Sequence, residues 1–279
     1  MPIAIPPEYV TAPDGVRLAV YECGNPAGPE LLLIHGFAQS HLCFARQLQS
    51  EVARDCRIVA YDLRGHGASD KPADAAAYQG GSVWARDLAA VMAAKRLRRP
   101  VLAGWSMGGR IIRQYLMNFG DRRIAGLNFV GSLVVEDARA RGPAGARPRP
   151  AASAPLGVQL EAAIAFLDGC YAIKPSEADF RVAIGYNMMV PFQVREAIGG
   201  WSTDPAETIV ALAKVRVPTL ITHGRQDAIV LPLAAEMTAQ AILGARLSWF
   251  DACGHAPFQE DSARFNSELS AFVTSTVVA

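Results

Sequence analysis

The feature that most constrains this chain is an alternation of short strand-like segments with amphipathic helical ones. The segments with the composition of strands are residues 16–22, 31–34, 57–61, 101–103 and 124–130. Those in which apolar side chains recur three and four positions apart, as in helices, are residues 44–52, 82–97 and 107–118. Most of the strand-like segments are apolar along their whole length, which is typical of strands buried on both faces. The alternation therefore predicts an α/β chain with a mostly parallel sheet flanked by helices.

The alternation stops after residue 135. Residues 142–155 carry four prolines among glycines and alanines, a composition typical of an irregular link. The segments that follow contain helix-start signals and no strand pattern. Ser176 lies three residues before Asp179, as in a capping box, and Asp204 comes directly before a proline. This part of the chain is therefore expected to be all helical.

The strand pattern returns at residues 217–222 and 246–250. We therefore expect a helical cap inserted into an α/β core after its sixth strand, rather than two independent domains. The predicted division is a first part of the core at residues 1–135, a cap insertion at 136–210 and a second part of the core at 211–279.

The charge of the chain is nearly balanced, with 27 Lys and Arg against 26 Asp and Glu. Without a basic excess, neither nucleic acid nor an anionic membrane is an expected partner. The apolar runs fall far short of the ~20 residues that cross a bilayer. The first residues lack a signal-peptide pattern, and the five cysteines form no CxxC pair. These features favour a cytoplasmic protein with a small-molecule partner, and they leave its oligomeric state open.

One motif in the chain carries chemistry by its context. Gly104-Trp105-Ser106-Met107-Gly108 matches G-x-S-x-G and lies between a predicted strand and a predicted helix, where a nucleophile elbow must lie. Glycines allow the sharp turn, and the serine then stands at the positive end of the helix. Ser106 is therefore the candidate nucleophile.

A serine nucleophile needs a general base and a group that orients the base. Of the five histidines, His255 alone lies late enough for the chain order Ser…Asp…His, in a loop after the last predicted strand. Asp227 follows the strand at 217–222 and is the predicted orienting acid. Asp137, after an earlier strand, is the reserve candidate.

The charge that develops on a substrate carbonyl oxygen needs backbone donors aimed at it. The amide of Met107, directly after the nucleophile, is one expected donor. The amide of Phe37, in the loop after the strand at 31–34, is the other. Neither a zinc-ligand spacing nor a G-x-G-x-x-G turn is present, so no metal and no organic cofactor are expected.

These motifs together resemble the α/β-hydrolase family. The resemblance rests on H-G-F at 35–37, D-L-R-G-H-G at 62–67, G-W-S-M-G-G at 104–109, Asp227 and His255, in the expected order across nearly the whole chain. Met107, the two following glycines and Phe37 are similar to the cofactor-free haloperoxidase and aryl-esterase group. A serine at the nucleophile position disfavours the reactions of family members that use an aspartate there, such as haloalkane dehalogenases and epoxide hydrolases.

The resemblance implies the α/β-hydrolase fold and a serine hydrolase that cleaves carboxylic esters through an acyl-enzyme. The cap sequence contributes aromatic residues and methionines with no obvious charged pair to hold an acid, which favours small to medium apolar or aryl esters. Perhydrolysis of the haloperoxidase type, acyl transfer, lactone opening and carbon–carbon bond hydrolysis fit the same residues. A ligand receptor built on the same scaffold is the non-enzymatic alternative.

Overall fold

The computed structural model describes residues 5–198 and 201–276. Its centre is an eight-stranded sheet with the strand order β1-β2-β4-β3-β5-β6-β7-β8. The strands are β1 (Glu8–Thr11), β2 (Arg17–Gly24), β3 (Glu30–Ile34), β4 (Arg57–Tyr61), β5 (Val101–Trp105), β6 (Gly126–Val130), β7 (Thr219–Gly224) and β8 (Arg246–Phe250).

The sheet is mostly parallel, as predicted. β2 pairs antiparallel with β1 and β4, whereas every pair of neighbours from β4 to β8 is parallel. In this register Ile34 of β3 lies opposite Gly104 of β5, and Val130 of β6 lies opposite both Trp105 and Thr222. The carboxyl ends of the central strands therefore meet at one edge, where open α/β sheets bind their ligands.

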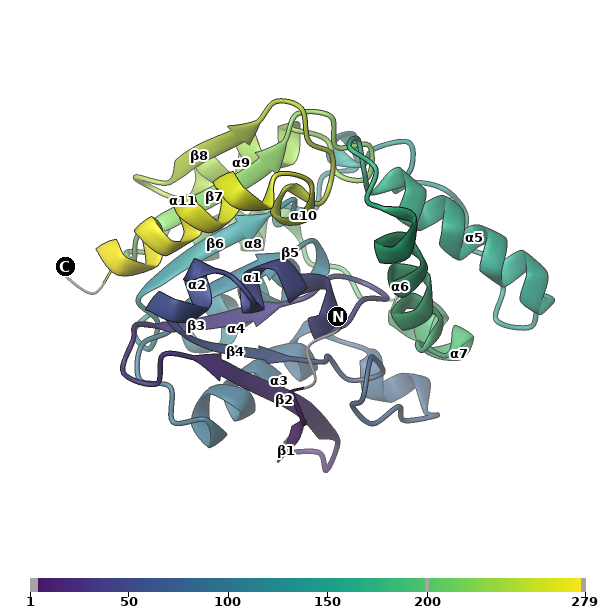
Figure 1. Ribbon diagram of the computed structural model, residues 1–279, viewed down its shortest axis with the longest axis horizontal. Coiled ribbons are helices and arrows are strands. Elements are labelled where there is room, and N and C mark those ends of the chain that lie inside the picture. The colour runs from purple at the N-terminus through teal and green to yellow at the C-terminus, as the bar shows by residue number, and fades with distance from the viewer. Residues whose placement is uncertain (1–4, 199–200, 277–279) are drawn as a thin grey trace.

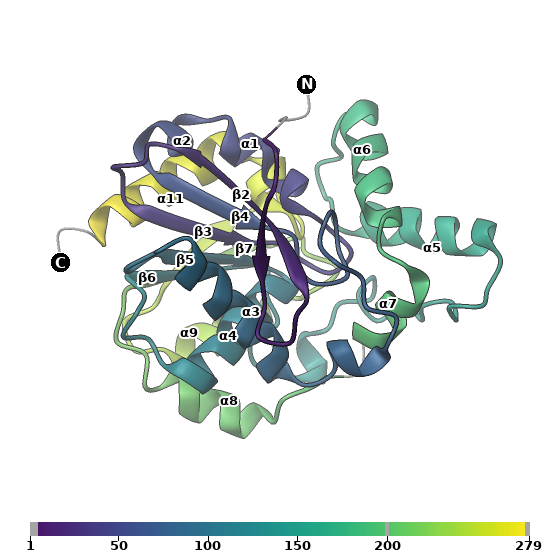
Figure 2. The same cartoon turned by 90° about the horizontal axis from the view of Figure 1, so that it is seen from below.

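Helices cover both faces of the sheet (Figures 1 and 2). The helices that supply buried side chains to one face are α3 (Gly81–Ala94), α4 (Met107–Phe119), α8 (Pro205–Leu212) and α9 (Leu233–Ala241). Those on the other face are α1 (Ala45–Leu48), α2 (Glu51–Asp55), α10 (Pro257–Glu260) and α11 (Ser262–Ser275). Trp84, Ile111 and Phe258 are almost fully buried in these layers. Each such side chain contributes about 1.5–3 kcal/mol by leaving water.

The chain between β6 and β7 is helical, as expected. It holds the short 3-10 helix η3 (Ala138–Ala140) and then α5 (Leu156–Gly169), α6 (Glu177–Met188), α7 (Phe192–Ile198) and α8. The two predicted helix starts are present: Ser176 Oγ accepts from the Asp179 amide at 3.1 Å, and Asp204 Oδ1 accepts from the Ala206 amide at 2.8 Å.

Figure 1 shows α5, α6 and α7 beyond one end of the sheet, while Figure 2 shows α8 beneath the core near α9. The insertion thus follows the sixth strand. The extent of the cap, residues 136–210, stays a prediction.

Three local details differ from the sequence interpretation. β1 was not predicted, because Val10 is its one buried residue. The predicted helix at 44–52 is divided into η1 (His41–Phe44), α1 and α2, since Ser50 caps a new helix start by accepting from the Val52 amide at 3.2 Å. The predicted helix at 82–97 ends at Ala94, two residues before the positive φ of 53° at Arg96. One more short 3-10 helix, η2 (Ala75–Tyr78), precedes α3.

The search for membrane-spanning helices covered the described residues, and none of their helices is both long and apolar enough to cross a bilayer. All five cysteines are free thiols, and four of them are buried.

Candidate active site

Ser106 lies on a strained turn between β5 and α4. Its backbone has φ 54° and ψ −114°, a conformation that costs a non-glycine residue about 1–3 kcal/mol. Two glycines allow the tight packing that fixes the turn. A Cβ on Gly104 would lie 2.6 Å from the carbonyl carbon of Gly108, and a Cβ on Gly108 would lie 2.2 Å from the Ile34 oxygen. The turn is the geometry expected of a nucleophile elbow.

The serine hydroxyl is available for chemistry. The Ser106 amide donates to the Val130 oxygen at 2.8 Å, which ties the turn to the end of β6. Its side chain is partly exposed between buried neighbours and has no hydrogen bond to any residue that the structure describes. The hydroxyl is therefore held in place by the backbone, not by a side-chain partner.

Asp227 and His255 are brought together by loops that follow β7 and β8. His255 Nδ1 lies 2.7 Å from Asp227 Oδ2, and both side chains are almost completely buried. The other carboxylate oxygen, Oδ1, accepts from the amides of Ile229 and Val230, each at 2.8 Å. Burial by itself raises the pKa of the Asp227 carboxyl, but the adjacent His255 and His223 outweigh it and hold this pKa well below the usual range.

With Asp227 ionised, the proton of the His255 ring lies on Nδ1 and is donated to the carboxylate. Nε2 then presents a lone pair. This nitrogen is buried and has no hydrogen bond partner among the described residues. A neutral imidazole with a free Nε2 is the form that can accept a proton from a nucleophile.

The His255 loop is anchored beside the serine turn. Trp105, directly before Ser106, donates from its indole nitrogen to the His255 oxygen at 2.8 Å. The His255 amide donates in turn to the Cys170 oxygen at 2.9 Å, at the end of α5. A Cβ on Gly131, at the end of β6, would lie 3.2 Å from His255 Nδ1. The ends of β5 and β6 therefore hold both Ser106 and the histidine loop.

The two predicted oxyanion donors belong to segments that meet at Ser106. Met107 begins α4, and its amide donates no hydrogen bond within the described part of the chain. Phe37 has a similarly unused amide in the loop after β3. A Cβ on Gly36, next to Phe37, would lie 3.1 Å from the Cβ of Ser106. Two backbone donors without acceptors thus lie next to the serine.

Asp137, the reserve candidate for the orienting acid, has another partner. Its carboxylate caps η3 through the Arg139 amide at 2.8 Å and pairs with the Arg139 guanidinium at 2.7 Å. These contacts with Arg139 lower the pKa of Asp137 to about 2. The structure gives Asp137 no contact with a histidine among the described residues.

Two other histidines have structural roles. His35 Nδ1 bonds to the Gly36 oxygen at 2.8 Å, and its Nε2 accepts from the Leu63 amide at 3.0 Å. His66 is held in the same manner by the Arg64 oxygen and the Ala38 amide. Both ring nitrogens are occupied in each case, so neither imidazole serves as a base.

The burial of these two histidines predicts that the folded protein is less stable at acidic pH. Burial lowers the pKa of His35 to about 4 and that of His66 to about 3, from an ordinary value of 6.5. At a pH between the lowered pKa of each histidine and its ordinary value, the unfolded chain binds a proton that the folded protein does not. The stability present at pH 7 is therefore lost as the pH falls. We expect a loss on the order of 2 kcal/mol at pH 5 for each histidine.

Urea unfolding at pH 7 and pH 5 measures this loss. His35→Gln is expected to show a smaller difference between the two pH values than the wild type, whatever its absolute stability. Equal free energies of unfolding at both pH values in the wild type would contradict the assignment.

His223 is a site residue that the sequence interpretation missed. Its Nε2 lies 2.9 Å from the Val230 oxygen and 3.3 Å from Asp227 Oδ2, on the side of the carboxylate away from the backbone amides. The ring therefore helps to fix Asp227. Its position four residues before Asp227 at a strand end was the available signal.

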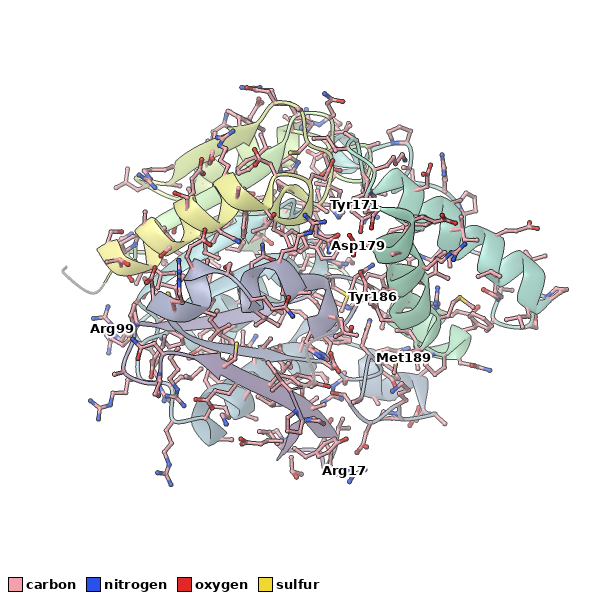
Figure 3. The ribbon with its side chains drawn as sticks, viewed as in Figure 1. Arg17, Arg99, Tyr171, Asp179, Tyr186 and Met189 are labelled. Atoms are coloured by element: carbon pink, nitrogen blue, oxygen red, sulfur yellow. The ribbon has the colours of Figure 1, made fainter. Side chains whose placement is uncertain are left out.

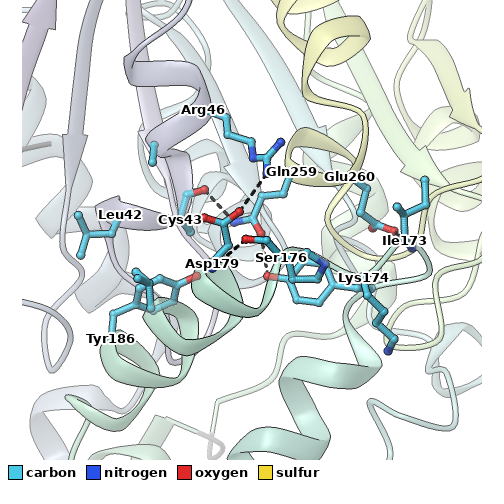
Figure 4. A pocket seen from close by; sticks show the side chains of 14 residues that line it. Leu42, Cys43, Arg46, Ile173, Lys174, Ser176, Asp179, Tyr186, Gln259 and Glu260 are labelled. Atoms are coloured by element: carbon cyan, nitrogen blue, oxygen red, sulfur yellow. Dashed lines mark hydrogen bonds and ion pairs between the residues drawn. The ribbon is translucent and has the colours of Figure 1, made fainter. Parts of the chain in front are cut away.

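A polar cavity lies at the seam between the core and α6, but its groups are already paired. Figure 3 shows Tyr171, Asp179 and Tyr186 along this seam, and Figure 4 shows the cavity, of about 260 Å³, from close by. Asp179 pairs with Arg46 at 3.2 Å, and Gln259 donates to the Cys43 oxygen at 2.8 Å. Neither Ser106 nor His255 lines it, so it is not part of the candidate active site.

The described residues include no cluster of three or more His, Cys, Asp or Glu side chains arranged to hold a metal ion.

Comparison with known proteins identifies the family to which this fold belongs. Residues 29–262 match the family model described as the alpha/beta hydrolase fold. A putative aryl esterase from Burkholderia cenocepacia superposes with a TM-score of 0.92 at 35% identity, covering 98% of this chain and 100% of that one. An esterase from Rhodococcus sp. ECU1013 gives 0.87 at 31% identity, with the same coverage of both chains.

Among curated relatives, a non-heme haloperoxidase from Rhodococcus erythropolis is 28% identical over 295 aligned positions, covering 96% of this chain and 99% of that protein. The match of the family model and the likeness to solved structures extend across nearly the whole chain. This chain therefore belongs to the α/β-hydrolase family, in its group of esterases and haloperoxidases.

Proposed function

We propose that the protein hydrolyses carboxylic esters of small to medium apolar or aryl substrates through an acyl-enzyme on Ser106. The observation that carries the proposal is the buried pair of Asp227 and His255, 2.7 Å apart, with the histidine Nε2 unpartnered beside the serine turn. The likeness to the two esterases supports the same chemistry. We also propose that the protein is located in the cytoplasm.

In the proposed mechanism, Ser106 Oγ attacks the ester carbonyl carbon while His255 Nε2 takes the hydroxyl proton. The imidazolium that forms is stabilised by the ionised Asp227. The amides of Phe37 and Met107 donate to the oxyanion, and losing either donor would raise the barrier by about 3 kcal/mol. The tetrahedral intermediate then collapses, and His255 gives its proton to the departing alcohol.

The second half of the reaction repeats the first with water. His255 accepts a proton from a water molecule that attacks the acyl-enzyme carbonyl. As the second tetrahedral intermediate collapses, the bond to Ser106 Oγ breaks, His255 gives its proton to that oxygen, and the carboxylic acid leaves. No step uses a group outside these five residues.

Perhydrolysis is the second candidate, because one relative is named a haloperoxidase. In that reaction hydrogen peroxide replaces water in the second half, and the product is a peracid instead of a carboxylic acid. The same three side chains would serve both reactions, so only the products separate them.

Steady release of nitrophenol from 4-nitrophenyl acetate and butyrate tests the proposed function. We expect many turnovers per protein molecule, since water regenerates the serine. With added hydrogen peroxide, peracid formation slower than ester hydrolysis would favour the esterase, and faster formation would favour the perhydrolase. Release that stops at one equivalent, or no release, would support a receptor instead.

A further inference from the structure

A second cavity, of about 410 Å³, lies beside the candidate active site. Phe37 forms part of its wall. The amide of Phe37 is a proposed oxyanion donor, and the neighbouring Gly36 lies against Ser106. The rest of its wall comes from the link before α5, from α5 and from α7. Its aromatic lining consists of Phe37, Phe166 and Phe192. This cavity is placed to receive the part of a substrate that extends away from the reacting carbonyl.

Arg149 lies over the face of the Phe37 ring, with the guanidinium carbon 4.0 Å from the ring centre. Among the described residues it makes no ion pair and donates no hydrogen bond, and although the residue is exposed overall, it forms part of the cavity wall. The loss of hydration at the cavity wall and the positive charges of Arg110 and Arg141 lower the pKa of Arg149. Arg110, by contrast, is paired with Glu136 at 2.9 Å.

Arg195, on α7, lines the same cavity. Arg195 donates to the backbone oxygens of Val190 and Asn187, not to a carboxylate. Burial and the positive charge of Arg149 lower its pKa to about 10. Within the described part of the chain, Glu196 is the one acidic residue that lines the cavity, and it pairs with neither arginine. The cavity thus has three arginines in its wall, Arg147, Arg149 and Arg195, and none of them pairs with a carboxylate among the described residues. Of these, Arg149 and Arg195 are close enough for the charge of one to act on the other.

Two neighbouring cations that repel each other are stabilised when an anion lies between them. A guanidinium binds a carboxylate through two parallel hydrogen bonds, and the aromatic lining suits an apolar body. The cap sequence has no obvious charged pair that could hold an acid. In the structure Arg149 and Arg195, 46 positions apart in the chain, line one cavity.

We propose that the cavity bounded by Phe37, Arg149 and Arg195 binds a carboxylate carried by the substrate. The preferred substrates are then esters whose apolar or aryl body ends in a carboxylate, such as monoesters of dicarboxylic acids. This inference rests on the proposed function and narrows its substrate class.

A matched pair of esters tests the inference. The mono-4-nitrophenyl ester of glutaric acid carries the carboxylate, and its methyl ester does not. We expect the wild-type ratio of kcat/KM, acid over methyl ester, to exceed ten. Arg149→Gln and Arg195→Gln should each lower this ratio at least tenfold, mainly through KM. Arg149→Lys should lower it less, because lysine keeps the positive charge but cannot form both parallel hydrogen bonds.

Arg17→Gln is the control for removal of one positive charge, because Arg17 lies on β2 away from the cavity and pairs with Asp70 (Figure 3). It should keep the wild-type ratio. A wild-type ratio near one, or equal ratios in the wild type and both cavity variants, would overturn the proposal.

A binding measurement separates this proposal from the proposed hydrolysis. Calorimetry with the Ser106→Ala protein compares 5-phenylpentanoate with its amide, neither of which contains an ester. We expect the acid to bind at least tenfold more tightly, and Arg149→Gln to remove the difference. Equal binding of acid and amide would overturn the carboxylate site, even if neutral esters were turned over. Tight binding of the acid without any ester turnover would support the site and contradict the esterase.

Discussion

Asp227→Asn is expected to lower kcat on a neutral ester by about 10⁴-fold while leaving the protein folded. The amide oxygen of the new side chain can still accept from Ile229 and Val230, which fix the loop at 2.8 Å each. Its amide nitrogen would replace the oxygen that now lies 2.7 Å from His255 Nδ1. An amide donates, so the histidine proton would move to Nε2, and Nε2 could no longer accept the proton of Ser106.

Steady-state kinetics with circular dichroism as the check on folding measures this effect. Asp137→Asn is the matched control, because it makes the same chemical change at a carboxylate that contacts Arg139 instead of a histidine. It should change kcat by less than about twofold, since surface substitutions of this kind have small effects. A large loss in Asp137→Asn and a small one in Asp227→Asn would instead identify Asp137, in the chain after β6, as the orienting acid.

Ser106→Ala is expected to reduce kcat by an even larger factor, about 10⁶-fold, because the whole nucleophilic route depends on its hydroxyl. The hydroxyl makes no hydrogen bond with the described residues, so its removal should leave the fold intact. Substrate should still bind, and an equilibrium measurement of its dissociation constant can confirm this. Ser270→Ala, which removes a hydroxyl bonded to Asp55 on the opposite part of the molecule, should retain wild-type kcat.

Wild-type kcat in Ser106→Ala would place the nucleophile elsewhere. Loss of both activity and circular dichroism signal would instead show that the turn itself had failed. In that case Ser106→Cys, which replaces the hydroxyl with a nucleophilic thiol, provides the second comparison, with low but measurable turnover expected.

Much of the fold could be predicted because local sequence and tertiary packing agree. The central strands are apolar along their length, and they became β3 to β7 with small shifts at their ends. β1 was missed because an edge strand with a single buried residue has no pattern to detect. The helix at 44–52 was predicted as one because its apolar spacing continues through Ser50, whose side chain nevertheless starts a new helix.

The candidate site was predictable to a different extent. Ser106, Asp227 and His255 follow strands whose order along the chain determines which loops meet, so their grouping could be inferred from position. His223 also lies at a strand end, so its position was a usable signal, whereas Arg149 and Arg195 could not be inferred in this way. Arg149 lies in an irregular proline-containing link and Arg195 on a short helix, and no periodicity relates the two. Their convergence depends on how the link folds back along α5 and α7.

Covalent labelling tests the central claim, that Ser106 is acylated, most directly. A 4-nitrophenyl alkylphosphonate should react once per chain, since it mimics the tetrahedral state that the Phe37 and Met107 amides stabilise. Mass spectrometry of the digested protein should place the adduct on Ser106, and labelling should abolish ester turnover in proportion to the fraction modified. Ser106→Ala protein should remain unlabelled. An adduct on another residue that accompanies the loss of activity, or full activity after Ser106 has been modified, would contradict the proposed mechanism.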